Sequence, residues 1–155
     1  MIIRRATVKD KDSLNKLLCQ VLSVHHNSRP DIFKAGTKKY TDEELFAIIA
    51  DDTRPIFVAE DENTVVGYAF CIYQQYKNNN ILTDIKTLYI DDLCVDETCR
   101  GKNIGKALYE YVLDFAKMQG FYNVTLNVWS GNEGALRFYE KMGLKPQKIG
   151  MEKIL

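Results

Sequence analysis

A short stretch of the chain, residues 94–108 (CVDETCRGKNIGKAL), places glycines and positive charge where a helical pattern begins. Its glycines and cations are Arg100, Gly101, Lys102, Gly105 and Lys106. The first turn of a helix has backbone N–H groups without partners and carries the positive end of the helix dipole. Glycines also let a phosphate approach the backbone. The pattern therefore indicates an anion site, and the alternative is a glycine-capped loop with a solvated basic face.

Two well-known phosphate loops do not fit this stretch. A Walker loop needs four residues between its first glycine and Gly-Lys, followed by Ser or Thr. Here three residues separate Gly101 from Gly105, and Ala107 follows Lys106. The dinucleotide pattern G-x-G-x-x-G also fails, because Asn103 occupies the middle position and the third glycine is missing.

Further polar side chains lie on both sides of this loop in the sequence. Asp91 and Asp92 are adjacent within an apolar run, so on a regular strand they point to opposite faces and only one faces a cleft. Asn132 and Tyr139 are seven residues apart, which is about 700° of helical turn and returns them to one face. The structural alternatives are solvated strand-end carboxylates, a helix cap at Asn132 and a packing role for Tyr139.

The hydrophobic pattern predicts the elements that position these groups. Apolar residues at helical spacing begin at Leu14, and residues 25–36 interrupt this first helix. A second helix starts with a capping box at Thr41 and Glu44. Strands are expected over residues 2–8, 54–61, 64–76, 87–95 and 123–128, with a hairpin turn at 61–63. A helix is expected over 104–116, and Gly120 ends it. Another is expected over 130–142, where Ser130 and Glu133 form a capping box. A final strand pair is expected in 144–155. The order β-α-α-β-β-β-α-β-α-β(-β) predicts a mixed α/β fold.

The bulk composition limits the classes of function. The 155 residues fit one domain spanning 1–155, and 46% hydrophobic residues provide for a core. Lys plus Arg and Asp plus Glu both number 21, so net charge gives no attraction toward nucleic acid or a membrane surface. No signal peptide and no apolar run of about 18 residues is visible, which favours a cytoplasmic protein.

Metal and thiol chemistry have little support. The four cysteines (Cys19, Cys71, Cys94 and Cys99) lack zinc-ligand spacing and are typical of reduced thiols. His25 and His26 are adjacent, but no third ligand follows in range, so no metal is expected. Trp129, after the 123–128 strand, is assigned to packing.

From Ile90 to Leu144 the chain resembles the GNAT N-acetyltransferase superfamily. The string RGKNIG, residues 100–105, matches the family's acyl-CoA loop except at Asn103, where the family has glycine. The string NEGALRFYEKMG, residues 132–143, matches the helix that follows the fifth strand, and the opening IRRATVKDKDSLNKLL also has the family's appearance. Because Asn tolerates left-handed backbone angles, the turn should survive, with a cost in cofactor affinity.

The resemblance implies a GNAT-like fold, with a mixed and mostly antiparallel sheet flanked by helices, and acetyl-CoA as co-substrate. Phosphates would lie on the N–H groups near residues 101–106, and the pantetheine arm would pair with the fourth strand, which should separate from the fifth after Val95. The implied cofactor-binding residues are Leu93, Cys94, Val95, Arg100, Gly101, Lys102, Asn103, Ile104, Gly105, Lys106, Asn132 and Tyr139.

The resemblance also implies catalytic roles. Tyr139 corresponds to the family's general acid for the departing thiolate. The string YIDDL resembles the acidic strand of polyamine acetyltransferases, which makes Asp91 the candidate base, with Asp92 in its place if a bulge shifts the register. The acceptor would lie over the first two helices, where His25, Arg29, Asp31 and Phe33 could bind it. Arg29 could equally pair with an acidic substrate.

The favoured function is acetyl transfer to a primary amine of a small molecule. The alternatives are acetylation of a protein N-terminus or lysine, and a catalytically silent acyl-CoA-binding module. Family members often dimerise through their C-terminal strands, so a homodimer is a further expectation.

Overall fold

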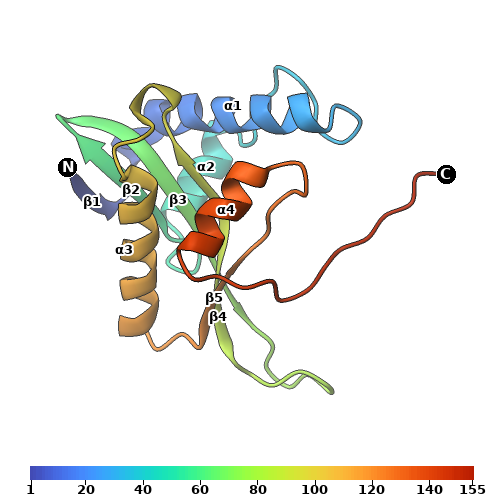
Figure 1. Cartoon of the computed structure of the whole chain (residues 1–155). Coiled ribbons are helices and arrows are strands. Elements are labelled where there is room, and N and C mark those ends of the chain that lie inside the picture. The colour runs from blue at the N-terminus through green and yellow to red at the C-terminus, as the bar shows by residue number, and fades with distance from the viewer.

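The computed structural model describes residues 1–155 and has a five-stranded mixed sheet flanked by four helices (Figure 1). The predicted α/β fold class is therefore confirmed. The strands are β1 (Ile2–Arg5), β2 (Ile56–Asp61), β3 (Thr64–Gln75), β4 (Lys86–Val95) and β5 (Asn123–Leu126). The helices are α1 (Lys11–Ser28), α2 (Asp42–Ile49), α3 (Ile104–Met118) and α4 (Glu133–Lys141), with short 3₁₀ turns at Val8–Asp10 and Glu97–Cys99.

The strands follow one another across the sheet in chain order, β1-β2-β3-β4-β5. The first four are antiparallel, whereas β5 is parallel to β4. A parallel neighbour needs a crossover connection, and α3 supplies it. The predicted hairpin between β2 and β3 is present, and Glu62 and Asn63 take the positive φ angles of its turn.

Helices cover both faces of the sheet. On one face α1 and α2 bury Leu14, Leu17 and Leu45 against β3 residues such as Tyr68. On the other face α3 packs its apolar stripe, including Val112 and Ala116, against the sheet. None of the four helices is both long and apolar enough to cross a bilayer.

Two helix starts and one helix end test the capping predictions. Thr41 Oγ1 accepts a hydrogen bond from the Glu44 backbone N–H at 3.1 Å, as predicted for α2. The predicted Ser130 cap is wrong, because the Asn132 side chain caps α4 by accepting from the Ala135 N–H. The predicted break of the first helix at residue 25 is also wrong. Helix α1 continues to Ser28 and ends before Pro30, which disfavours helical geometry at the residue preceding it.

The C-terminal segment, residues 144–155, differs most from expectation. A strand pair was predicted there, but the segment is extended and joins no ladder of the sheet. Figure 1 shows it leaving the body of the fold after α4. Its apolar side chains Ile149, Met151, Ile154 and Leu155 are exposed. The predicted strand pair is therefore wrong, because no strand of the sheet accepts this segment as a neighbour.

Candidate active site

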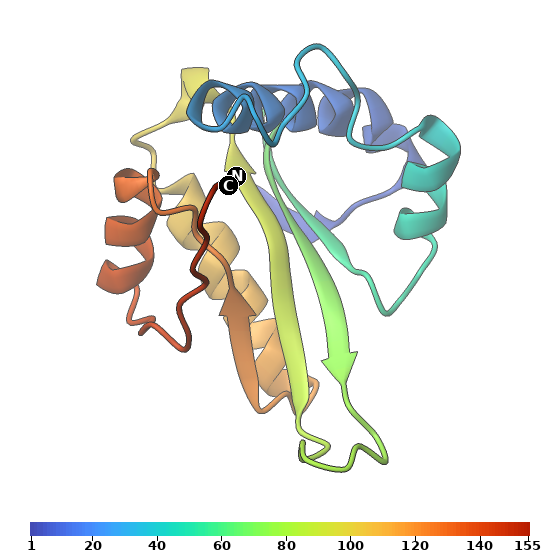
Figure 2. The same ribbon diagram turned by 90° about the vertical axis from the view of Figure 1, so that its right-hand side faces the viewer.

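A cleft of about 1970 Å³ opens where β4 and β5 stop pairing. The last pair of their ladder is Ile90 with Leu126, so the β4 backbone from Asp91 to Val95 has a free edge on that side (Figure 2). The separation predicted after Val95 therefore begins several residues earlier, after Ile90. The cleft exceeds the roughly 300–1,000 Å³ of a common ligand pocket.

A β-bulge in β4 brings two carboxylates to the same face. Phe70 pairs with Asp92 while the next β3 residue, Cys71, pairs with Ile90, so Asp91 has no partner in β3. The extra residue interrupts the alternation of side chains. The prediction that Asp91 and Asp92 point to opposite faces is therefore wrong. Both line the cleft on the side covered by α1 and α2.

Each carboxylate has its own partner. Lys39 Nζ lies 3.1 Å from Asp91 Oδ2, and the Tyr68 hydroxyl donates a 2.6 Å hydrogen bond to Asp92 Oδ2. Burial raises the pKa of Asp92 and outweighs the opposing effects of Tyr68 and Lys39. Burial alone would lower the pKa of Lys39, but the carboxylates of Asp92 and Asp91 raise it overall. Asp92 is thus a desolvated carboxylate with an increased affinity for a proton.

The loop before α3 contains two residues with left-handed backbone angles, Gly101 and Asn103. Gly101 has φ +87° and no atom within 4 Å of the position where a Cβ would lie. Asn103 is the N-cap of α3 in the left-handed conformation, φ 60° and ψ 19°, and its side chain makes no capping hydrogen bond. The first N–H groups of α3 therefore have no side-chain cap from Asn103, and the expected left-handed tolerance of Asn is observed.

The cofactor-binding residues proposed from the sequence divide into two groups. Leu93, Cys94, Val95, Arg100, Asn132 and Tyr139 line the cleft. Gly101, Lys102, Asn103, Ile104, Gly105 and Lys106 do not line it, and they form the loop and the first turn of α3 beyond Arg100. The Ile104 side chain is buried in the core, so this residue offers a ligand only its backbone.

Cys94 has no role as a nucleophile. Its side chain is buried beside α1, and burial raises the pKa of its thiol to about 12. The thiolate is the reactive form of cysteine, so the residue contributes packing and its backbone.

Helix α4 points two polar side chains into the cleft, as their spacing predicted. Asn132 and Tyr139 both line it, although Asn132 also caps the helix. The Tyr139 ring packs against Tyr109 and Phe138, at centroid distances of 6.2 and 5.1 Å. Burial raises the pKa of the Tyr139 phenol, and the Asp92 charge and Tyr109 raise it further. Tyr139 is therefore a protonated phenol at neutral pH.

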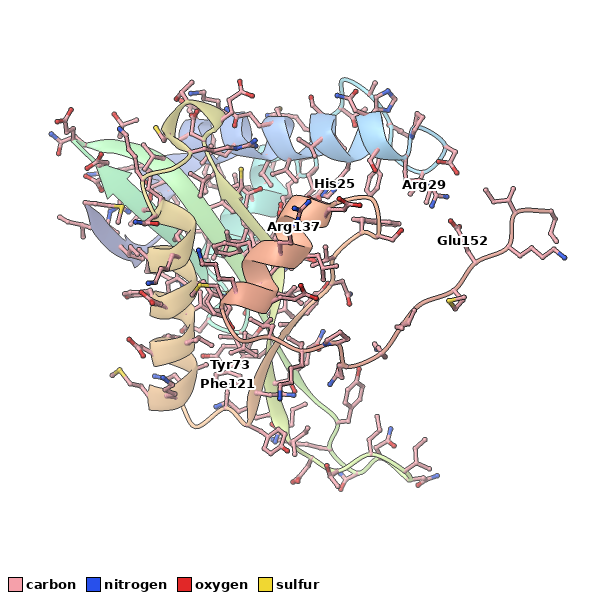
Figure 3. The ribbon with its side chains drawn as sticks, in the orientation of Figure 1. His25, Arg29, Tyr73, Phe121, Arg137 and Glu152 are labelled. Carbon is pink, nitrogen blue, oxygen red and sulfur yellow. The ribbon has the colours of Figure 1, made fainter.

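The residues expected to bind the acceptor are only partly together. His25, Arg29 and Phe33 line the cleft, whereas Asp31 does not. Arg29 is already occupied, because its guanidinium pairs with Asp31 at 2.9 Å and with Glu152 of the C-terminal segment (Figure 3). These two carboxylates leave Arg29 little capacity to bind an acidic substrate.

Two residues that line the cleft, and one buried residue behind it, were missed or misassigned from the sequence. Trp129 was assigned to packing, but it lines the cleft and meets the Phe33 ring edge-on at 5.4 Å. Lys39 and Tyr68, the partners of the two carboxylates, carried no recognisable signal. Tyr68 belongs to an apolar strand, and Lys39 belongs to a polar connection, so neither pattern marks a site.

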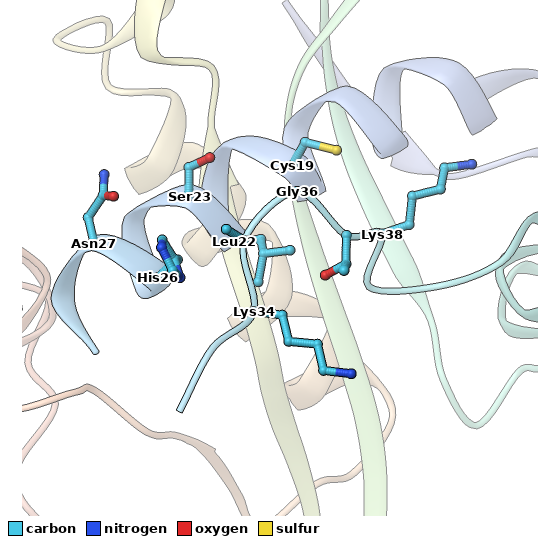
Figure 4. A pocket seen from close by; sticks show the side chains of 10 residues that line it. Cys19, Leu22, Ser23, His26, Asn27, Lys34, Gly36 and Lys38 are labelled. Atoms are coloured by element: carbon cyan, nitrogen blue, oxygen red, sulfur yellow. The ribbon is translucent and has the colours of Figure 1, made fainter. Parts of the chain in front are cut away.

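A second pocket of about 280 Å³ lies between the opposite side of α1 and residues 34–38 (Figure 4). His26 lines this pocket and donates from Nδ1 to the Phe33 carbonyl at 2.7 Å, whereas His25 lines the main cleft. The adjacent histidines therefore line different cavities. No three His, Cys, Asp or Glu side chains come together anywhere in the chain as a set of metal ligands.

Comparison with known proteins identifies the family. The model of the acetyltransferase (GNAT) family matches residues 22–144. Glucosamine 6-phosphate N-acetyltransferase of Arabidopsis thaliana is 38% identical over 68 residues, 44% of each chain. N-acetyltransferase family 8 member 2 of Rattus norvegicus is 31% identical over 126 residues, 77% of this chain and 53% of that protein. The chain thus spans about half the length of these curated relatives.

Solved structures agree over the whole chain. The tetramutant of the BH1408 protein of Bacillus halodurans is 34% identical, covers 100% of both chains and has a TM-score of 0.95. The Arabidopsis thaliana glucosamine-6-phosphate N-acetyltransferase is 28% identical, with 99% and 97% of the two chains covered and a TM-score of 0.69. With the cleft between β4 and β5 and the glycine-bearing start of α3, these matches show that the chain belongs to the GNAT family of acetyltransferases.

Proposed function

We propose that residues 1–155 form one N-acetyltransferase domain, which transfers the acetyl group of acetyl-CoA directly to a primary amine of a small molecule. The observation that carries the proposal is the composition of one cleft. Within it the free edge of β4, from Asp91 to Val95, runs from the two carboxylates toward the start of α3. A donor and an acceptor could therefore meet beside Asp92 and Tyr139.

The residues present fit acetyl-CoA. The N–H groups of residues 101–106, with Arg100 and Lys102 beside them, would hold its phosphates at the positive end of α3. Backbone groups of Leu93 and Val95 would pair with the amide groups of its pantetheine arm. When bound, acetyl-CoA supplies a thioester-activated acetyl group. The free strand edge and the open surroundings of Gly101 leave room for such a ligand.

The chain's own side chains would manage the protons. An alkyl ammonium has a pKa near 10.4 and must lose a proton before it becomes a nucleophile. Asp92 or Asp91 would accept that proton, and the raised pKa of Asp92 favours it as the base. The Tyr139 phenol would hydrogen-bond the sulfur as the thiolate leaves. A backbone N–H near Val95 would polarise the acetyl carbonyl.

A thiol-release assay with acetyl-CoA and a panel of amines and peptides tests this function. We expect saturable turnover with small amines, and calorimetry should show CoA binding. Asp92→Asn should lower kcat about 10²-fold while CoA affinity changes little. Asp91→Asn makes the same change at the neighbouring carboxylate and is the matched comparison for kcat and CoA affinity. CoA binding without thiol release on any amine would support a silent binding module, and turnover of peptides alone would support the protein acetyltransferase.

The proposed biological setting is a cytoplasmic homodimer with no nucleic-acid or membrane partner. In the dimer, the exposed apolar side chains of residues 144–155 in one copy would cover the unpaired outer edge of β5 in the other copy. Light scattering of the full chain should give a dimer mass, and Ile149→Asp with Met151→Asp should give a monomer. A monomeric parent chain would contradict this arrangement.

A further inference from the structure

On the acceptor side of the cleft, two carboxylates share one paired cation. The β4 bulge places Asp91 and Asp92 on the same face, and Lys39 is the one cation paired with them. The other titratable groups near them include His25, Tyr40 and Tyr139, with Tyr68, which donates to Asp92. A cationic ligand would complete this charge balance, because buried charges are normally paired.

The segment between α1 and α2 has little capacity for an anionic group, while Arg100, Lys145 and Lys148 line other parts of the cleft. Two cleft-lining cations, Arg29 and Lys39, come from the segment between α1 and α2, and both are in ion pairs. A substrate carboxylate or phosphate would have to displace Asp31 or Glu152 from Arg29, or Asp91 from Lys39. It would also approach the two β4 carboxylates, and juxtaposed like charges are strongly unfavourable.

An aromatic wall, formed by His25, Phe33 and Trp129, faces the same cleft. Phe33 stacks on His25 at a centroid distance of 4.9 Å, and it forms a T-shaped pair with Trp129 at 5.4 Å. Val24 and Ile32 line the same region, and Trp129 is 42% exposed. This wall joins the end of α1 to the loop after β5, and it offers apolar area and aromatic faces. Such surfaces bind aromatic groups and attract organic cations.

We infer that the acceptor is a monocationic primary amine with an aromatic or bulky apolar body and no carboxylate or phosphate. Its ammonium would lie against Asp91 and Asp92, and its body would lie against Phe33 and Trp129. The inference rests on the proposed acetyl transfer and names the substrate class of that same cleft.

The reaction of such an amine balances without any further reagent. The ammonium gives one proton to a β4 carboxylate, and the amine nitrogen then forms a C–N bond to the acetyl carbon. The nitrogen then gives up a second proton, and the C–S bond breaks with its electron pair going to sulfur, which takes up one proton. The products are a neutral amide, CoA thiol and one proton released to water.

Matched amines test the inference in the thiol-release assay. We expect kcat/KM for phenethylamine to exceed that for phenylalanine, which differs by one carboxylate, by about 10²-fold or more. Glucosamine 6-phosphate and spermidine should also be poorer substrates than phenethylamine. Preferential turnover of phenylalanine, glucosamine 6-phosphate or spermidine would overturn the substrate class and leave the acetyltransferase function in place. Absence of thiol release with every amine would overturn both.

A variant of the aromatic wall separates recognition from packing. Trp129→Ala should reduce the preference for phenethylamine over ethylamine about 10-fold, while CoA affinity is unchanged. Trp129→Phe retains an aromatic face and should keep most of that preference. An equal loss of turnover with both amines in Trp129→Ala would mean that Trp129 only supports the fold, and it would overturn the assignment of the wall.

Discussion

Replacing Tyr139 by Phe gives the sharpest test of the proposed chemistry. The Tyr139 ring packs against Tyr109 and Phe138, whereas burial and neighbouring charges, with no hydrogen bond, account for the raised pKa of its hydroxyl. Removal of the hydroxyl should therefore leave no buried partner unsatisfied. The free energy of unfolding should change by less than about 0.5 kcal/mol. For a domain of this size, Tm should then shift by no more than about 2 °C.

Turnover should respond very differently. If the phenol stabilises the departing thiolate, kcat should fall about 10²-fold, which corresponds to about 2.7 kcal/mol of transition-state stabilisation. CoA affinity should hardly change, because that interaction is strongest late in the reaction. The raised pKa keeps the phenol protonated through the neutral range. Tyr139 should therefore add no ionisation to the pH profile of kcat between about pH 6 and 9.

The assay combines kcat with any accepted amine and a CoA titration on the same preparation. Tyr111→Phe is the control, because Tyr111 lies on α3, packs edge-on against Phe57 and does not line the cleft. It should be silent in both measurements. Turnover of Tyr139→Phe within about threefold of the parent would refute the role of the hydroxyl. A joint loss of turnover and CoA affinity would indicate that Tyr139 positions the cofactor instead.

Three further changes test the loop and the fold. Gly105→Val should abolish CoA binding by crowding the first turn of α3, and a folded variant with unchanged affinity would exclude the phosphate site there. Asn103→Gly removes a left-handed non-glycine residue, so CoA binding should be equal or tighter, and a large loss would show that the Asn103 side chain contacts the cofactor. Asp10→Asn should cost about 3 kcal/mol in denaturant unfolding, because the buried carboxylate accepts two hydrogen bonds from Arg4. Arg4 lowers the pKa of Asp10 in the folded protein. The ionised Asp10 carboxylate therefore stabilises the fold above the unfolded pKa near 3.8, and this stabilisation is lost as pH falls through the folded pKa. The parent should therefore lose more stability than the variant on acidification below about pH 4.

Features controlled by nearby residues could be predicted from the sequence. The Thr41 cap, the hairpin at Glu62 and Asn63 and the end of α3 before Gly120 all follow from local backbone preferences. The common face of Asn132 and Tyr139 follows from helical periodicity. The loop of residues 100–105 was identified from its glycines and its position between a strand and a helix. Each depends on contacts within a few residues, which a single sequence displays.

Features controlled by distant partners were decided only by the tertiary structure. The bulge at Asp91 depends on how β4 pairs with β3, and it reversed the predicted facing of one carboxylate. The pairing of Arg29 with Glu152 joins residues 123 positions apart and changes which substrates the cleft accommodates. The extended segment after Leu144 shows the same limit, because a strand can be predicted locally but its neighbour cannot. Register and ion pairing depend on which segments meet in space, and the local pattern carries no information about that choice.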